Sequence, residues 1–220
     1  MRALCIIPIA LALYVTASTT LAAGLGTNEL AAVRSQGSNS LATFKELITP
    51  SNYKLMGFNS TNDVSSATNG EPLLIFTIPL TQLRNYQVGQ GFLPLLEPTS
   101  RAIIPIMVNG KVRSSTTVRL DPAGWTTANW GQPKLIGDLM GAYETVAPAA
   151  MNPGTFPFAV EVPVFNLWFI GYFDVQNSLV LRSTVRLYLG PDTIGQNQDI
   201  TQAAMYRLAT LSQNYNGRPN

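Results

Sequence analysis

A serine and a lysine three residues apart are the first side chains in this chain that could perform covalent chemistry. Ser51 and Lys54 match the S-x-x-K spacing of serine acyl-transfer enzymes, in which the serine begins a helix and the lysine activates it one turn later. Pro50 precedes the pair, and the residues that follow predict a short strand over 53–58. A strand would place Ser51 and Lys54 on opposite faces. We therefore interpret the pair as a loop that enters a strand.

A glycine–lysine pair at Gly110-Lys111 is the second candidate, because phosphate-binding loops end in Gly-Lys. Such a loop needs an earlier glycine at the position that Pro105 occupies, and a helix after the lysine. Residues 111–120 instead alternate as a strand does, and Asn109-Gly110 is typical of a type I′ hairpin turn. The pair is predicted to be a turn between two strands.

Composition excludes the most common nucleophile–base pairs. The chain has no histidine, and its single cysteine, Cys5, lies in the N-terminal segment described below. Ser-His-Asp and Cys-His machinery and His/Cys zinc or copper sites are therefore excluded, and we expect no catalytic residue, metal or cofactor. The 12 acidic residues are scattered singly. Glu161 interrupts an apolar run, as alternation on a half-exposed strand would require.

Two similar basic runs predict a binding surface. Residues 112–120 read VRSSTTVRL, and residues 181–187 read LRSTVRL. In a regular strand, Val112 and Ser114 share one face and the arginines share the other. If both strands belong to one sheet, four arginines line a surface that could bind an acidic partner or a carboxylate. The predicted binding residues are Arg113, Thr117, Arg119, Arg182, Thr184 and Arg186. The alternative is a solvated sheet face that these residues keep soluble.

Two tryptophans, Trp125 and Trp130, could stack on sugars or grip peptides. Their spacing of five residues places them on opposite faces of a regular strand. We expect at least one of them to be buried, because they form no shared platform unless the strand bends.

The first residues, 1–22, have the pattern of a secretory signal peptide. A short basic region precedes an apolar segment over 5–15, and Thr20 and Ala22 occupy the small-residue positions of a cleavage site near Ala22/Ala23. The apolar segment is too short for a membrane span. The sequence therefore predicts a periplasmic or secreted protein with no membrane span after signal removal.

Charge is nearly balanced over the predicted mature chain. Without Arg2, 13 Lys and Arg oppose 12 Asp and Glu. A net charge this small provides no general attraction to nucleic acid or to an anionic membrane. We expect no nucleic-acid partner.

Apolar spacing predicts three long helices with strands between them. Helices are expected over 28–48, over 133–146, and at the C-terminus after an Asp199 cap. Strands are expected over 53–58, 72–80, 102–120 (a hairpin), 156–173 and 178–190. Strands and helices do not alternate regularly, which favours an α+β fold with one or more antiparallel sheets.

The chain after the signal peptide is predicted to form one exported α+β domain over 23–220, with sub-halves at 53–146 and 156–216. Two predicted hairpins, 102–120 and 164–189, each precede a helix, and each carries one of the basic runs. A weak internal duplication is one interpretation of this similarity, and shared strand composition is the other.

These features predict an exported, non-enzymatic binding module of the cell envelope. Its contacts would be sheet edges or the Arg/Thr face, and its partner would be another envelope or extracellular protein or an acidic glycan. Two alternatives stay open. One is a structural subunit of a periplasmic or surface assembly, and the other is a carboxylate-dependent secreted hydrolase.

Overall fold

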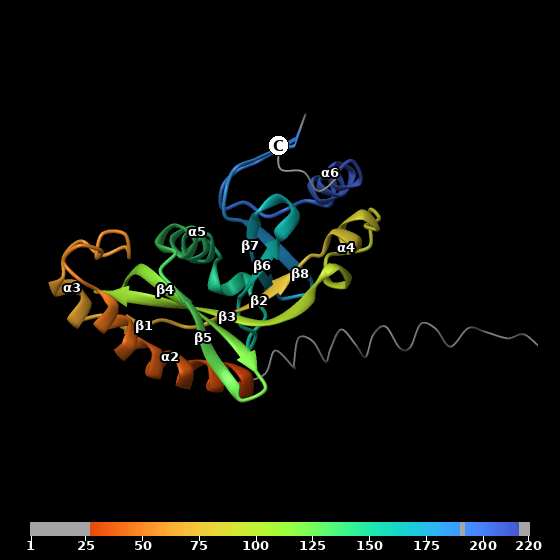
Figure 1. Cartoon of the computed structure of the whole chain (residues 1–220). Helices are drawn as coiled ribbons and strands as arrows, with labels where there is room; N and C mark the ends of the chain where they lie inside the picture. Colours follow the sequence, from red (N-terminus) through yellow and green to blue (C-terminus); the bar gives the residue numbers. More distant parts are fainter. Residues whose placement is uncertain (1–26, 190–191, 216–220) are drawn as a thin grey trace, which may run out of the picture.

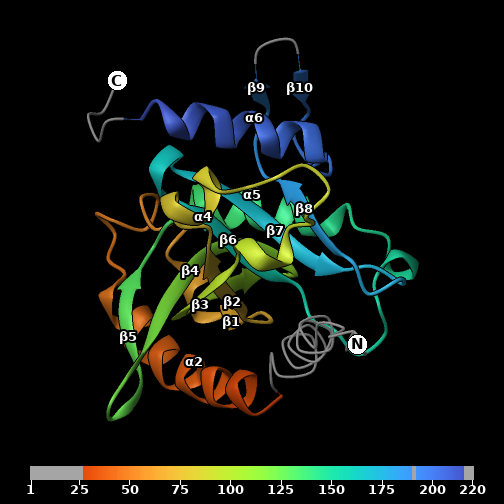
Figure 2. The same ribbon diagram turned by 90° about the vertical axis from the view of Figure 1, so that its right-hand side faces the viewer.

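The computed structural model describes residues 27–189 and 192–215, and the predicted signal peptide lies outside these residues. Eight strands form one mostly antiparallel sheet, and helices pack on both of its faces (Figures 1 and 2). The α+β class with N-terminal, central and C-terminal helices is thus confirmed. Within the described part of the chain, no helix has the length and apolar character that crossing a membrane requires.

The elements have the following bounds. The helices are α2 (Thr27–Leu47), α3 (Asn62–Ser65), α4 (Leu80–Arg84), α5 (Pro133–Glu144) and α6 (Gln202–Gln213). Short 3-10 turns lie at Leu93–Leu95, Pro148–Ala150 and Pro163–Phe165. The strands are β1 (Thr68–Asn69), β2 (Leu73–Thr77), β3 (Glu97–Val108), β4 (Lys111–Asp121), β5 (Gly124–Trp130), β6 (Phe158–Val162), β7 (Leu167–Phe173), β8 (Leu179–Ser183), β9 (Leu187–Leu189) and β10 (Asp192–Ile194).

The large sheet has the strand order β5-β4-β3-β2-β6-β7-β8, and β1 pairs with β3 off this path. All neighbours run antiparallel except β2 and β6, which are parallel. Two antiparallel meanders, β2–β3–β4–β5 and β6–β7–β8, therefore meet at one parallel pair. This order is compatible with an internal duplication, which stays a prediction because strand order alone does not test common origin. β9 and β10 form a separate ribbon.

The hairpin between β3 and β4 has the predicted type I′ turn. Asn109 and Gly110 both have positive φ, 51° and 73°. The predicted strand over 53–58 is wrong, because residues 50–57 form consecutive turns. Ser51 Oγ lies 2.8 Å from the hydroxyl of a neighbouring threonine, and the Lys54 ammonium lies over the Tyr53 ring. Among the described residues, no hydrogen bond joins Ser51 to Lys54.

Helix α2 packs on one face of the sheet as a single unbroken helix. Leu30, Val33 and Phe44 are buried along one stripe, as the apolar spacing predicts. Gly37 lies on the same stripe, and a Cβ there would stand 2.8 Å from Ile104 Cδ1 on β3. The glycine thus lets the helix approach the sheet closely.

Helix α5 covers part of the opposite face, across β3 and β4 from α2 (Figure 1). Pro133 is its first residue, where a missing N–H has no cost because first-turn N–H groups lack helical partners. Ile136, Leu139 and Ala142 are fully buried against a cluster that includes Ile103.

Helix α6 is capped differently from the prediction. Thr201 Oγ1, and not Asp199, accepts the Ala204 N–H at 3.1 Å. At the other end of the helix, the Arg84 guanidinium of α4 donates to the Ser212 carbonyl at 3.0 Å. The predicted Asp199 cap is wrong because this carboxylate is engaged elsewhere, as described below.

Replacing Tyr86 with phenylalanine should leave stability unchanged or raise it by up to about 1 kcal/mol, because the Tyr86 hydroxyl is buried without a hydrogen-bond partner. Burial also raises the pKa of Tyr86 above its usual 10.0. A raised folded-state pKa gives stability that is present below pH 10 and is lost as pH rises through the folded pKa. Urea unfolding at neutral pH and above pH 10 should therefore show that Tyr86→Phe loses less free energy of unfolding at alkaline pH than the unchanged chain does. Tyr206→Phe, at a half-exposed position, is the matched control, and destabilisation by Tyr86→Phe at neutral pH would contradict the argument.

Candidate functional site

A groove opens on the α5 side of the sheet, between the N-terminal half of α5, strand β5 and the turns that flank β7 and β8. Its volume is about 730 Å³. We call it the α5 groove. Its apolar lining consists of Ile75, Ile103, Ala128, Leu135, Trp168 and Val185. Its polar lining consists of Arg101, Thr117, Asn129, Gln132, Lys134, Asp138, Glu161, Asn166 and Thr184.

An ion pair spans the floor of the groove. Arg101 on β3 donates to Glu161 on β6, and strand β2 lies between the two. Alternation along β6 buries Val160 and Val162 on the far face and directs Glu161 into the groove, where its side chain is 20% exposed. This geometry explains why a carboxylate interrupts an apolar run, as the sequence indicated.

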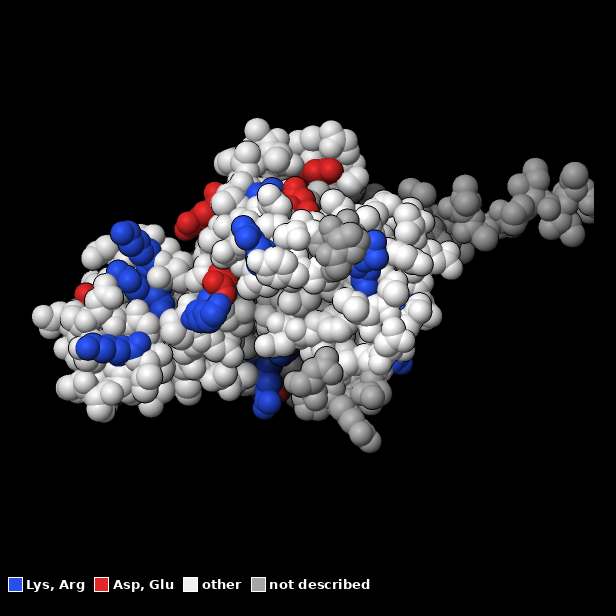
Figure 3. All heavy atoms as spheres, turned by 90° about the horizontal axis from the view of Figure 1, so that it is seen from above, with Lys and Arg blue, Asp and Glu red and all other residues white. Residues whose placement is uncertain are grey.

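A second ion pair lies on the wall of the groove. Lys134 donates to Asp138 one turn later on α5, at 2.6 Å. The four charged residues that line the groove thus neutralise each other in pairs. On the face seen in Figure 3, positive and negative groups likewise lie side by side in several places, while Lys and Arg gather at the end that carries α3. A groove with balanced charges suits a polar ligand of low net charge better than a polyanion.

The predicted arginine surface begins at an irregular position. Ser114 pairs with Ile106 and Val112 pairs with Met107, so Arg113 is the extra residue of a β-bulge. The bulge resets the alternation. Val112 packs on the α5 side, whereas Ser114 lies beside Ile106 on the α2 side, so their predicted common face is wrong.

The other three arginines also fail to form one surface. Arg119 is 60% exposed on β4 and pairs with Asp121 at 3.1 Å. Arg182 lies on β8, with four strands between it and β4, and Arg186 lies exposed beyond the end of β8. The strands do share one sheet, but the prediction of four arginines on a common open side is wrong. The binding roles of the individual residues stay predictions.

Two of the predicted site residues do line the groove. Thr117 lies on β4, and Thr184 follows β8, where its hydroxyl donates to the Trp168 carbonyl at 2.8 Å. The two threonines line the same opening because β4 and the start of β7 both border it.

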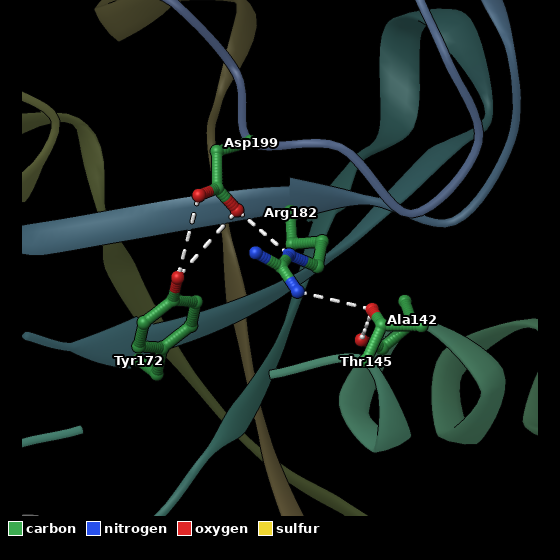
Figure 4. Close-up of polar contacts among 5 residues, drawn as sticks. All are labelled: Ala142, Thr145, Tyr172, Arg182 and Asp199. Atoms are coloured by element: carbon green, nitrogen blue, oxygen red, sulfur yellow. Dashed lines mark hydrogen bonds and ion pairs between the residues drawn. The ribbon is translucent and has the colours of Figure 1, made fainter. Parts of the chain in front are cut away.

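Arg182 belongs to a compact polar cluster near the C-terminal end of α5 (Figure 4). Its Nε donates to Asp199 at 2.7 Å, and its Nη1 donates to the Thr145 hydroxyl at 3.0 Å. The guanidinium carbon lies 5.9 Å from the centre of the Tyr172 ring, and the Tyr172 hydroxyl lies 3.5 Å from both carboxylate oxygens of Asp199. Only 14% of the Arg182 side chain is exposed. This arginine therefore joins elements of the fold and does not project from an open face.

The cluster perturbs the protonation of its members. The hydrogen bond to Asp199 raises the pKa of Arg182. Burial raises the pKa of Tyr172, and the neighbouring Asp199 carboxylate adds to this effect. Both shifts keep the cluster in one charge state: a cationic arginine and a neutral tyrosine around the carboxylate.

One edge of the sheet is covered, and the other is open. Beside β8, the segment 197–200 bonds back to the strand, with Ile200 N–H to Leu181 carbonyl at 2.7 Å and Ser183 N–H to Gln198 carbonyl at 2.9 Å. Within 27–189 and 192–215, no comparable backbone hydrogen bonds reach the outer side of β5. The open edge runs along the α5 groove, because Ala128 and Asn129 belong to both.

Strand β5 also contains a bulge. Thr127 pairs with Val118 and Asn129 pairs with Thr117, so Ala128 is an extra residue. The bulge brings Trp125 and Trp130 to the same face despite their spacing of five, where each is half-buried against a core cluster on the α2 side. The expectation of opposite faces is thus wrong, but neither indole is free to form a binding platform.

Sequence reasoning missed the two ion pairs of the groove. Lys134 and Asp138 carry a readable signal, since a lysine and an aspartate four positions apart pair on a helix. Arg101 and Glu161 carry none, because their contact depends on a strand order that local pattern does not specify. Comparisons with protein-family models, with curated proteins and with solved structures found no match for this chain.

Proposed function

We propose that this chain is a non-enzymatic binding module of the cell envelope that takes up an extended segment of a partner protein at β5 and in the α5 groove. The observation that carries this proposal is the open edge strand beside a groove with balanced charges. An open edge presents unpaired N–H and C=O groups with the spacing that a partner strand needs.

The bulge at Ala128 restricts where a partner strand can pair. Bulges twist an edge strand away from regular pairing and protect it against indiscriminate association. Regular pairing is available over 124–127, before the bulge. Beyond it, the partner would leave the edge and enter the groove.

The groove then supplies specificity. Leu135 and Trp168 offer apolar contact, and Asn129 and Gln132 offer donors and acceptors for a peptide backbone. The paired charges disfavour a strongly charged segment, because such a segment would have to compete with existing ion pairs.

Ala128→Lys should weaken peptide binding by about tenfold or more, because it places a charge on the open edge beside the groove. Linear peptides selected from a random displayed library against the purified chain serve as probes. Hydrogen exchange should show protection of the 124–130 amides by these peptides. Ala31→Lys, on the exposed side of α2, is the matched control and should bind as the unchanged chain does. Peptides that protect other segments, or equal binding by both variants, would contradict the proposal.

A carboxylate-dependent hydrolase is the second candidate, because Asp138 and Glu161 line one groove. Paired carboxylates can perform general acid and base roles if one of them carries a proton. Here each already accepts a hydrogen bond from a cation, Glu161 from Arg101 and Asp138 from Lys134, and this engagement of both carboxylates favours binding over hydrolysis. Turnover of fluorogenic peptide or glycoside substrates that is lost in Glu161→Gln and in Asp138→Asn would reverse this ranking.

The open edge also bears on the structural-subunit alternative. A second copy that paired at β5 would give oligomers whose proportion rises with concentration. Sedimentation of the purified chain over a wide concentration range tests this alternative. A strict monomer would count against a structural subunit and leave the binding module in place.

A further inference from the structure

A second cavity, of about 630 Å³, lies on the other flank of α5. Met140 and Tyr143 line it from the helix, whereas Lys134 and Asp138 line the α5 groove from the opposite flank. The segments 70–73 and 151–157 form most of the remaining wall. We call this cavity the methionine pocket. It is separate from the α5 groove, so the proposed function does not depend on it.

Methionines are concentrated in this pocket. The chain has six methionines, and Met107, Met140 and Met151 all line the same cavity. Thioether side chains are flexible and polarizable, and surfaces rich in them adapt to apolar ligands of different shape. Prolines at 72, 148, 153 and 157 line the pocket as well and limit the backbone freedom of its wall. An adaptable floor within a restrained wall is suited to a small apolar molecule.

The mouth of the pocket carries an ion pair between Arg34 and Glu71, of which Glu71 is the member that lines the cavity. Glu71 is the only charged residue among the described residues that line the cavity. Both bonds that it accepts from Arg34, at 3.1 and 2.7 Å, go to its Oε2 atom, so Oε1 has no described partner. The Glu71 side chain is 73% exposed. A ligand N–H at the mouth can therefore reach a carboxylate oxygen without breaking the ion pair.

Aromatic rings at the pocket point to the same charge. Tyr143 and Phe156 both line it, and the Arg34 guanidinium carbon already lies 6.0 Å from the centre of the Phe156 ring. Aromatic faces attract cations, and because Arg34 already lies at the Phe156 ring, Tyr143 is the aromatic lining residue left to a ligand ammonium. A carboxylate head group at Glu71 Oε1 would face a like charge.

From these observations we propose that the methionine pocket binds small amphiphilic amines, with the aliphatic body against Met107, Met140 and Met151 and the ammonium group at Glu71. The ligand class follows from the apolar lining and the single carboxylate at the mouth. No covalent step is involved.

The test uses the purified full-length chain with ¹³C-methyl-labelled methionine, titrated with octylammonium or octanoate below the concentration at which either forms micelles. Octylammonium should shift the methyl signals of Met107, Met140 and Met151 and leave those of Met56 and Met205 in place. It should bind more tightly than octanoate by up to about fivefold, the upper end of what one exposed ion pair contributes.

Two variants separate the head-group contact from the apolar contact. Glu71→Gln should abolish the preference for octylammonium over octanoate while the same three methyl signals still shift. Glu144→Gln, at an exposed position on α5 that does not line the pocket, should keep the preference. The proposal is overturned if neither probe shifts the three signals, if Met56 and Met205 shift equally, if octanoate binds as tightly, or if Glu71→Gln retains the preference.

Discussion

Phe158→Ala is expected to lower the free energy of unfolding by about 3–5 kcal/mol, the usual cost of removing a buried phenylalanine ring. Phe158 is 2% exposed on β6, and its ring centre lies 5.0 Å from that of Phe76 and 6.1 Å from that of Phe173. Its loss removes the middle ring of this row and leaves a cavity. Domains of this kind have about 5–15 kcal/mol of total stability, so urea unfolding should show a large shift of the midpoint.

Gly171 provides the control for this prediction. A Cβ at Gly171 would lie 2.4 Å from Cε2 of the Phe158 ring, so Gly171→Ala alone should destabilise the protein by about 1–3 kcal/mol through overpacking. In the Phe158→Ala background, the methyl group that Gly171→Ala adds enters the space left by the ring. It should then raise the free energy of unfolding by up to about 1 kcal/mol. The sign of the Gly171→Ala effect should therefore reverse. Additive effects of the two substitutions would show that the ring does not occupy this place.

Arg182→Met should cost about 1–3 kcal/mol, because it removes hydrogen bonds to a carboxylate and to Thr145 while it keeps an unbranched apolar stem. Asp199 would also lose its cationic partner, and the segment 197–200 would be held less firmly against β8. Hydrogen exchange of the Ile200 amide should accelerate, while urea unfolding gives the change in stability.

Arg119→Met is the matched control for Arg182→Met. Arg119 is 60% exposed and its pair with Asp121 is solvated, so its loss should change the free energy of unfolding by less than about 1 kcal/mol. The two substitutions, at arginines from similar sequence runs, should thus differ severalfold in the free energy of unfolding that they remove. Equal effects would contradict the structural role assigned to Arg182.

Features set by local pattern could be predicted from the sequence. The apolar stripe of α2 follows helical spacing, and the turn at Asn109-Gly110 follows from the backbone preferences of those residues. Ser60 and Asp63 match the S-x-x-D pattern of a capping box, and each accepts a hydrogen bond from the backbone N–H of the other. This feature is also local, since the pattern is contained within four residues.

Irregularities within strands were not predictable. The residues Arg113 and Ala128 are extra positions on their strands, and alternation fails at each. A bulge depends on how the neighbouring strand is registered, which local composition does not encode. The predicted common face of Val112 and Ser114, and the predicted opposite faces of the two tryptophans, fail for this single reason.

The candidate site was least predictable because its parts come from distant positions. The groove depends on β2 separating Arg101 from Glu161, and on α5 leaving part of that face uncovered. The sequence identified Thr117 and Thr184 only through an arginine pattern that proved to be wrong. Asp199 is a further example. Its position before α6 predicts a helix cap, but its carboxylate binds Arg182 and Thr201 caps the helix.

The single parallel pair at the centre of the sheet has a consequence for how the chain folds. Each meander closes through contacts between strands that are neighbours in the sequence, whereas β3, β4, β5 and α5 lie between Ile75 and its partner Ala159 along the chain. Contacts between distant positions carry a loop-closure cost and form slowly. We therefore expect the two meanders to order first and the β2–β6 seam to close late. Until then, the seam edges of β2 and β6 stay exposed, and this interval is when the chain is most prone to pair with other copies.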